Sequence, residues 1–245
     1  MFVSFNNALN DLFSNGVFEN IKIFPTYDGS DAEIEVLKKN MQAFVRFYKE
    51  RGVEISLVDQ GPLNMNLKII GASVAGSTDK DNRRFTNLVS GDDIILTKHL
   101  GDLSFLSLYR THYFQNNEKK SLSAQRYSVL QEMTTSNYLI AKMINSYLPR
   151  IDQTHQADKN IAFSTDISGP GTDVLFEASE ASRVDLNLLS PIFLNPISLY
   201  FSRKNHTSST NGPIAISAKP HLISEIMTKL NSMGFVRCWK IGNII

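Results

Sequence analysis

The sequence predicts an α+β protein built in two parts. Strand-like runs and one long amphipathic helix fill residues 1–98. Helical periodicity dominates from 102 to 148, and a strand, a glycine-bearing turn and a helix then follow one another twice, at 160–183 and 213–234. We therefore expect one domain over residues 1–98 and a second over residues 99–245, with the boundary near Lys98.

The first part is expected to begin with a helix and a strand. Apolar residues recur at helical spacing from Phe5 to Phe13, and the SNG sequence that follows is typical of a helix end. A strand is expected over 17–25, ending at Pro25. Residues 31–51 then form a strongly amphipathic helix, with Ser30 or Asp31 as its N-cap and Gly52 just past its end.

Three further strands are expected in this part, at 53–58, 66–76 and 92–98. The polar segment 77–91 between the last two resembles a hairpin loop. In the second part we expect helices over 102–114 and 124–148, and a last strand over 235–242 with Cys238 in its middle. The two parts therefore differ in their balance of strand and helix.

The composition excludes several classes of protein. Twenty-five Lys and Arg against 24 Asp and Glu leave a formal charge of +1, too small for a broad cationic field that holds nucleic acid. One cysteine cannot form an internal disulfide, which favours a reducing compartment. The N-terminus does not resemble a signal peptide, and no apolar run reaches the roughly 18 residues of a membrane span. We expect a cytoplasmic protein with no nucleic-acid and no membrane partner.

Two aspartates have settings that favour metal or phosphate chemistry. Asp11 lies on the first helix beside Asn6, Asn7 and Asn10, so one region of the helix surface carries amide and carboxylate oxygens. Asp166 ends a predicted strand and precedes the glycine turn SGPG, where a carboxylate meets backbone amides. Standard phosphate-loop, dinucleotide and hydrolase signatures do not occur, and the five histidines are dispersed. Each aspartate could equally be a cap or turn former.

Four segments of the sequence resemble the conserved blocks of the selenophosphate synthetase family, in the same order. They read NALND from Asn7, GDDIILTKHLG from Gly91, TDISGPG from Thr165 with EASEAS after it, and SSTNG from Ser208, which departs most from the family pattern. That family is related to aminoimidazole ribonucleotide synthetase and to a hydrogenase maturation factor. The resemblance implies an aminoimidazole ribonucleotide synthetase-like fold, with an incomplete N-terminal α/β domain over 1–98 and the C-terminal α+β domain over 99–245.

The resemblance also implies ATP and Mg²⁺ as cofactors and an ATP-dependent phosphotransferase, resembling selenide, water dikinase, if the chain is active. Such chemistry consists mainly of positioning and charge neutralisation by metal ions on aspartates. By resemblance, Asp11 and Asp166 would hold metal. The nucleotide would be bordered by residues from three of the blocks: Asn7, Thr97, Lys98, Gly169 and Gly171.

The departures from the family pattern leave two functions open. The family's glycine-rich segment with its catalytic cysteine or selenocysteine precedes the first block and has no counterpart here, and Cys238 cannot replace it. Glycines at three nucleotide-adjacent turns have also changed. The chain is therefore expected to be either a phosphotransferase with impaired or altered catalysis, or a non-catalytic binding or regulatory paralogue. Relatives dimerise through their N-terminal sheets, which predicts a homodimer or a partner subunit.

Overall fold

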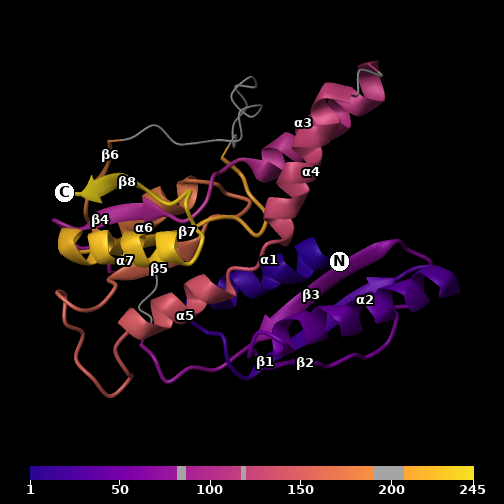
Figure 1. Cartoon of the computed structure of the whole chain (residues 1–245), viewed down its shortest axis with the longest axis horizontal. Coiled ribbons are helices and arrows are strands. Elements are labelled where there is room, and N and C mark those ends of the chain that lie inside the picture. The colour runs from indigo at the N-terminus through magenta and orange to yellow at the C-terminus, as the bar shows by residue number, and fades with distance from the viewer. Residues whose placement is uncertain (82–86, 117–119, 190–206) are drawn as a thin grey trace.

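The computed structural model describes residues 1–81, 87–116, 120–189 and 207–245. Within these ranges the chain forms two sheets with helices around them, and α1 (Phe2–Phe13) lies between the two (Figure 1). The α+β content agrees with the prediction. In the same ranges, no helix combines the length and the apolar character needed to cross a membrane.

The central strand of the smaller sheet is β1 (Ile21–Asp28). This strand pairs in parallel with β2 (Ile55–Leu57) and antiparallel with β3 (Ile69–Ala75). The core on its inner face contains aromatic and aliphatic side chains of α1 and of α2 (Asp31–Lys49). The predicted start of α2 is confirmed, because Ser30 and Glu33 form a capping box there.

The larger sheet is antiparallel throughout, with the strand order β5-β7-β4-β8-β6. Its strands are β5 (Phe163–Asp166), β7 (Ile214–Ala218), β4 (Asp93–Leu96), β8 (Trp239–Ile244) and β6 (Leu186–Leu188).

Alternation along the central strands buries both faces of this sheet. Ile95 and Ile216 share a core with α7 (Pro220–Ser232) and α5 (Tyr138–Tyr147), while Ile94 and Leu96 pack in a second core with α6 (Asp173–Ser182). The first of these cores also contains residues of α1 and β1. The small sheet and one face of the large sheet therefore share a single hydrophobic core.

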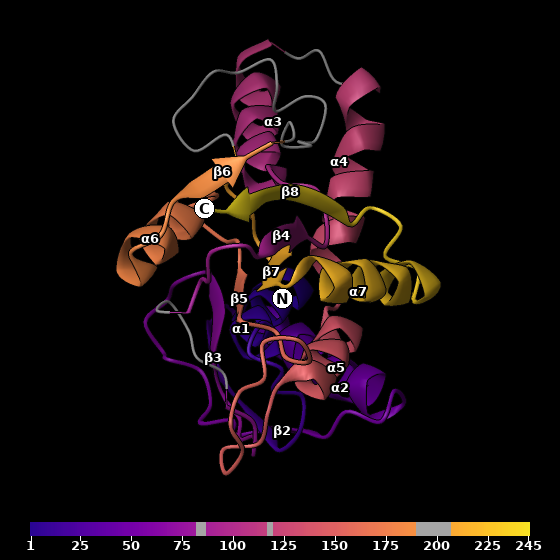
Figure 2. The same ribbon diagram turned by 90° about the vertical axis from the view of Figure 1, so that its left-hand side faces the viewer.

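Helices α3 (Asp102–Asn116) and α4 (Lys120–Thr134) extend side by side away from the sheets (Figures 1 and 2). The prediction of a single helix over 124–148 is wrong, because residues Thr135–Asn137 separate α4 from α5. The hydroxyls of Thr134 and Thr135 donate to carbonyls of the last turn of α4, and the Asn137 side chain is used elsewhere in the fold. Such side chains compete with the helical backbone and favour an end.

Other predicted boundaries also differ. β1 continues through Pro25 to Asp28, because its pairing with β2 is limited to Ile21–Ile23 and a missing N–H beyond that point costs little. The segment 77–91 does not join a hairpin, since β3 and β4 belong to different sheets; its residues 82–86 lie outside the described ranges.

The last predicted strand is displaced toward the C-terminus. Cys238 lies in a turn before β8, where its Sγ faces Met227 O and Asn231 Oδ1 of α7. Burial raises the pKa of this thiol. The boundary near Lys98 stays a prediction: β4, from the first part, pairs with β7 and β8 of the second.

Candidate functional site

Helix α1 reaches the loop 207–212 through asparagine side chains. The N–H of Asn211 donates to Asn7 Oδ1 at 2.8 Å, and Asn10 Nδ2 donates to the carbonyl of Gly212 at 3.4 Å. Asn137, at the start of α5, donates to both Asn10 Oδ1 (2.6 Å) and the Gly212 carbonyl (3.1 Å). Segments far apart in the sequence are thus joined at one place by amide side chains, of which Asn10 and Asn137 are buried.

The same loop closes on the glycine turn after β5. The hydroxyl of Ser208 donates to Gly169 O at 2.6 Å, and the N–H of Ser209 donates to Ser168 O at 3.0 Å. Gly171 has a φ of +67°, and a Cβ there would overlap Thr207 Oγ1. This glycine is therefore required by both its backbone conformation and the close approach of Thr207.

The two predicted metal-binding aspartates lie on elements that touch. The Ser164 hydroxyl of β5 donates to Ser14 O at the end of α1, at 2.7 Å. Asp166 follows two residues later in β5 and so shares the face of Ser164. Asp11 lies one turn before Ser14, whose hydroxyl donates to the Asp11 carbonyl. Asp166 is buried and Asp11 is exposed.

The described residues do not form an all-protein metal cage. Among the described residues, no group of three or more His, Cys, Asp or Glu side chains is arranged to hold a metal ion. Mg²⁺ usually keeps several waters and is bound by one or two carboxylates together with substrate phosphates. Asp11 and Asp166 lie on the touching elements α1 and β5, and their role as metal ligands stays a prediction.

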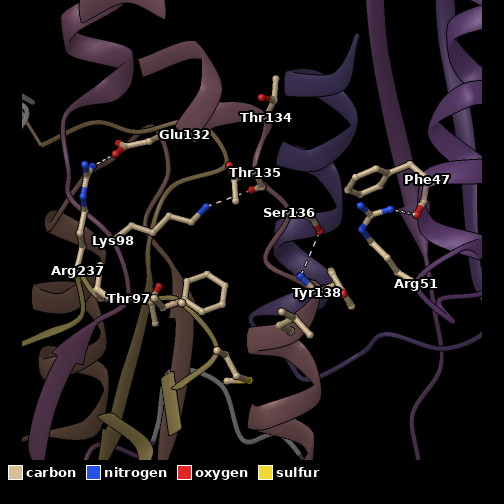
Figure 3. Close-up of a pocket in the computed structure, with 15 residues that line it drawn as sticks. Phe47, Arg51, Thr97, Lys98, Glu132, Thr134, Thr135, Ser136, Tyr138 and Arg237 are labelled. Atoms are coloured by element: carbon tan, nitrogen blue, oxygen red, sulfur yellow. Dashed lines mark hydrogen bonds and ion pairs between the residues drawn. The ribbon is translucent and has the colours of Figure 1, made fainter. Parts of the chain in front are cut away.

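Thr97 and Lys98 line a cavity of about 540 Å³ (Figure 3). The cavity lies between the end of α2, the α4–α5 connection and the turn before β8, and its described lining does not include the other five predicted residues. Thr97 is buried; its Oγ1 accepts from the Ile214 N–H at 2.9 Å, so this side chain holds β4 to β7. Lys98 Nζ donates to the carbonyls of Thr135 and Asn211, each at 3.3 Å.

Asp102 is buried, and Lys98 is partly buried. Burial lowers the pKa of Lys98 to about 8, while the charge of Asp102 acts in the opposite direction. Burial likewise raises the pKa of Asp102 to about 6, although the N–H groups of Thr210 and Leu103 donate to its carboxylate. The carboxylate thus ties the start of α3 to the loop 207–212.

Sequence reasoning missed Asp102 and Asn137. A usable signal existed for Asp102, because it follows LTKHLG directly and begins a predicted helix, a position that favours a carboxylate. Asn137 carried no comparable signal: its partners Asn10 and Gly212 are distant in sequence and meet it only in the fold.

The architecture is the aminoimidazole ribonucleotide synthetase-like fold, as the sequence predicts. Solved structures that share it include thiamine-monophosphate kinase from Stenotrophomonas maltophilia K279a, with a TM-score of 0.67, 14% identity and coverage of 98% of this chain and 73% of that one. The hydrogenase maturation protein HypE in complex with ATP gives a TM-score of 0.67 at 12% identity, covering 99% and 70%. AaThiL complexed with AMPPCP and TMP gives 0.64 at 16% identity, covering 99% and 74%.

These likenesses show the fold alone, because the identities are low. No protein-family model matches the sequence, and no curated protein matches it significantly.

Proposed function

We propose that this chain binds ATP with Mg²⁺ where α1, the end of β5 and the loop 207–212 meet, as a phosphotransferase-type protein of this fold. The observation that carries the proposal is the junction itself. Asn7 and Asn10 of α1, the glycine turn after Asp166 and the loop 207–212 are joined by hydrogen bonds although they are distant in sequence. Structures of the same fold have been solved with ATP and with AMPPCP, which supports a nucleotide as the ligand.

Asp11 and Asp166 are proposed to hold the metal. When bound, Mg²⁺ would neutralise the phosphate charge that the chain's own carboxylates otherwise repel. Gly169 is exposed, and a Cβ there would meet nothing within 4 Å, so a phosphate could approach the backbone at this position. Asn7 still has its amide Nδ2 for a nucleotide oxygen, since its Oδ1 is the atom that accepts from Asn211.

Isothermal titration with ATP and Mg²⁺ tests the proposal. We expect binding by the wild type. Asp166→Asn and Asp11→Asn should each lower the affinity by about tenfold or more, because a neutral amide binds Mg²⁺ more weakly than a carboxylate does. The matched control is Asp158→Asn on an exposed loop, which should bind as the wild type does. Folded protein that gives no heat at millimolar nucleotide would end the proposal.

A specific observation favours a second candidate, a binding module that does not transfer phosphate. The backbone N–H groups of Ser209, Thr210 and Asn211 all donate to the chain's own oxygens, namely Ser168 O, Asp102 Oδ1 and Asn7 Oδ1. Backbone amides that are already satisfied cannot cradle a phosphate as free ones do. Such a protein would bind nucleotide without turnover.

Phosphate release separates the two candidates. A phosphotransferase should release or transfer the γ-phosphate of ATP, and Asp166→Asn should abolish this. A binding module should give a measurable affinity in the titration and return the ATP intact after hours with equimolar protein.

We also propose that the chain associates with itself through the small sheet. Leu63, Met65, Leu67 and Ile69, at and before β3, are between 41% and 61% exposed, and Val36 of the neighbouring α2 is 56% exposed. Exposed apolar side chains beside a strand edge favour pairing with another chain.

A further inference from the structure

We propose that the cavity beside Lys98 is a second ligand site, which takes a small organic anion with an apolar body. The cavity has a volume of about 540 Å³, which is in the range of small-molecule sites. Most of its wall surface is apolar, and the apolar side chains come from three places in the sequence: Phe47, Tyr138 with Leu139, and Met233 with Phe235. An aromatic or aliphatic body would bury apolar surface against these side chains.

The charges of the described lining define the other end of the ligand. Three cationic side chains, Arg51, Lys98 and Arg237, accompany one carboxylate, Glu132. Glu132 forms an ion pair with Arg237, so it neutralises that arginine (Figure 3). Arg51 lies over the Phe47 ring, 3.7 Å from its centroid, and donates to the Phe47 carbonyl. The described lining therefore keeps a positive excess at Lys98 and Arg51, although Asp102, which is not part of this lining, offsets some of the charge of Lys98.

Lys98 is the group suited to hold the anion. Its ammonium carries three protons, and the acceptors it contacts among the described residues are two neutral carbonyls, each at the long distance of 3.3 Å. A carboxylate or phosphate oxygen would give it a charged acceptor, and a hydrogen bond between two ionised groups is stronger than one to a neutral carbonyl. The low pKa caused by burial agrees with this, because an anion in contact would restore the charged form.

This cavity is separate from the proposed nucleotide site. The backbone of Asn211 lies between them, since its N–H donates to Asn7 Oδ1 and its carbonyl accepts from Lys98 Nζ. Asp11, Asp166 and the glycine turn are not among the lining residues of the cavity. The inference therefore does not depend on whether ATP binds.

Fluorescence titration with 8-anilinonaphthalene-1-sulfonate provides the test, because this probe is an aromatic anion. N-phenyl-1-naphthylamine has the same body without the charge. We expect one saturable site for the anion, weakened about tenfold or more in Lys98→Met and retained in Lys98→Arg, while the neutral probe is little affected. Lys159→Met, on an exposed loop, is the matched control and should change nothing.

A second variant and a displacement experiment complete the test. Leu139→Trp narrows the cavity without removing a charge and should exclude both probes, which covers the case in which Lys98→Met does not fold. Displacement of the probe by 1-naphthoate or by 1-naphthyl phosphate shows which anion is preferred. Unchanged binding of the anion in folded Lys98→Met and Leu139→Trp would overturn the proposal. Competitive displacement by ATP would also overturn it, because the cavity would then be the nucleotide site; Asp166→Asn should leave probe binding intact.

Discussion

Gly171 combines a positive φ with a close neighbour, so replacing it by any residue with a Cβ should destabilise the folded protein. We expect Gly171→Ala to lower the free energy of unfolding by about 2–4 kcal/mol, because a left-handed alanine costs about 1–2 kcal/mol and the new Cβ displaces Thr207 Oγ1. That oxygen accepts from the Thr172 N–H at 3.0 Å, which adds to the loss.

Urea denaturation measures the effect, and Gly169→Ala is the matched control two residues away. A Cβ at Gly169 meets nothing within 4 Å, so we expect a change below about 1 kcal/mol. Equal losses in both variants would show that the turn does not depend on Thr207.

Asp102 should make the stability of the protein depend on pH. Because burial raises the pKa of this carboxyl from 3.8 to about 6, the folded protein keeps a proton that the unfolded chain releases between these two values. The free energy of unfolding should therefore fall as the pH rises from about 4 to about 6, and this contribution is constant above that range.

Asp102→Asn removes this titration but keeps an oxygen that can accept from the N–H groups of Thr210 and Leu103. Denaturation curves between pH 4 and 7 should show a smaller decrease for the variant than for the wild type. Parallel pH profiles for the two proteins would mean that Asp102 is ionised throughout.

At the scale of elements, the amides between α1, α5 and the loop 207–212 hold the candidate site together. Asn137→Ala should destabilise the protein by about 2–3 kcal/mol, because it leaves Asn10 Oδ1 and the Gly212 carbonyl buried without this donor. Asn15→Ala, whose side chain donates to the Asp11 carbonyl at an exposed position, should cost less than about 1 kcal/mol. Thermal unfolding of both variants provides the comparison, and a smaller shift for Asn137→Ala than for Asn15→Ala would contradict it.

The elements that could be predicted are those with a local cause. α2 has apolar periodicity, a capping box at Ser30 and a glycine after its end, and its bounds differ little from the prediction. β6 was not predicted, because its three residues become a strand only by pairing with β8. The division between α4 and α5 depends on hydroxyl groups that donate to the backbone, a signal that helical periodicity does not contain.

The candidate site follows the same rule. Asp11 and Asp166 were singled out by their local settings and then by the resemblance, whereas Asn7, Gly169 and Gly171 were chosen by the resemblance alone; all five roles stay predictions. Asn10, Asn137 and Asp102 act through partners that only the fold brings near. Lys98 was expected to border a nucleotide, which stays a prediction; its ammonium contacts two carbonyls at the edge of the cavity in Figure 3.

At the scale of the whole molecule, the uncovered side of β3 offers a test of self-association. β3 pairs with β1 along its length, and the apolar side chains before and on it remain exposed. If two copies join there, Ile69→Lys should place charge in the contact and shift the dissociation constant upward by about tenfold or more, since an unpaired charge in an interface is costly.

Ile151→Lys, at a position that is 70% exposed and far from β3 in sequence, is the matched control. Light scattering over a range of concentrations should show a mass above 27.5 kDa for the wild type and the control, and a shift toward 27.5 kDa for Ile69→Lys. A wild type that stays at 27.5 kDa at high concentration would refute self-association, and equal masses for all three proteins above that value would assign the contact to another surface.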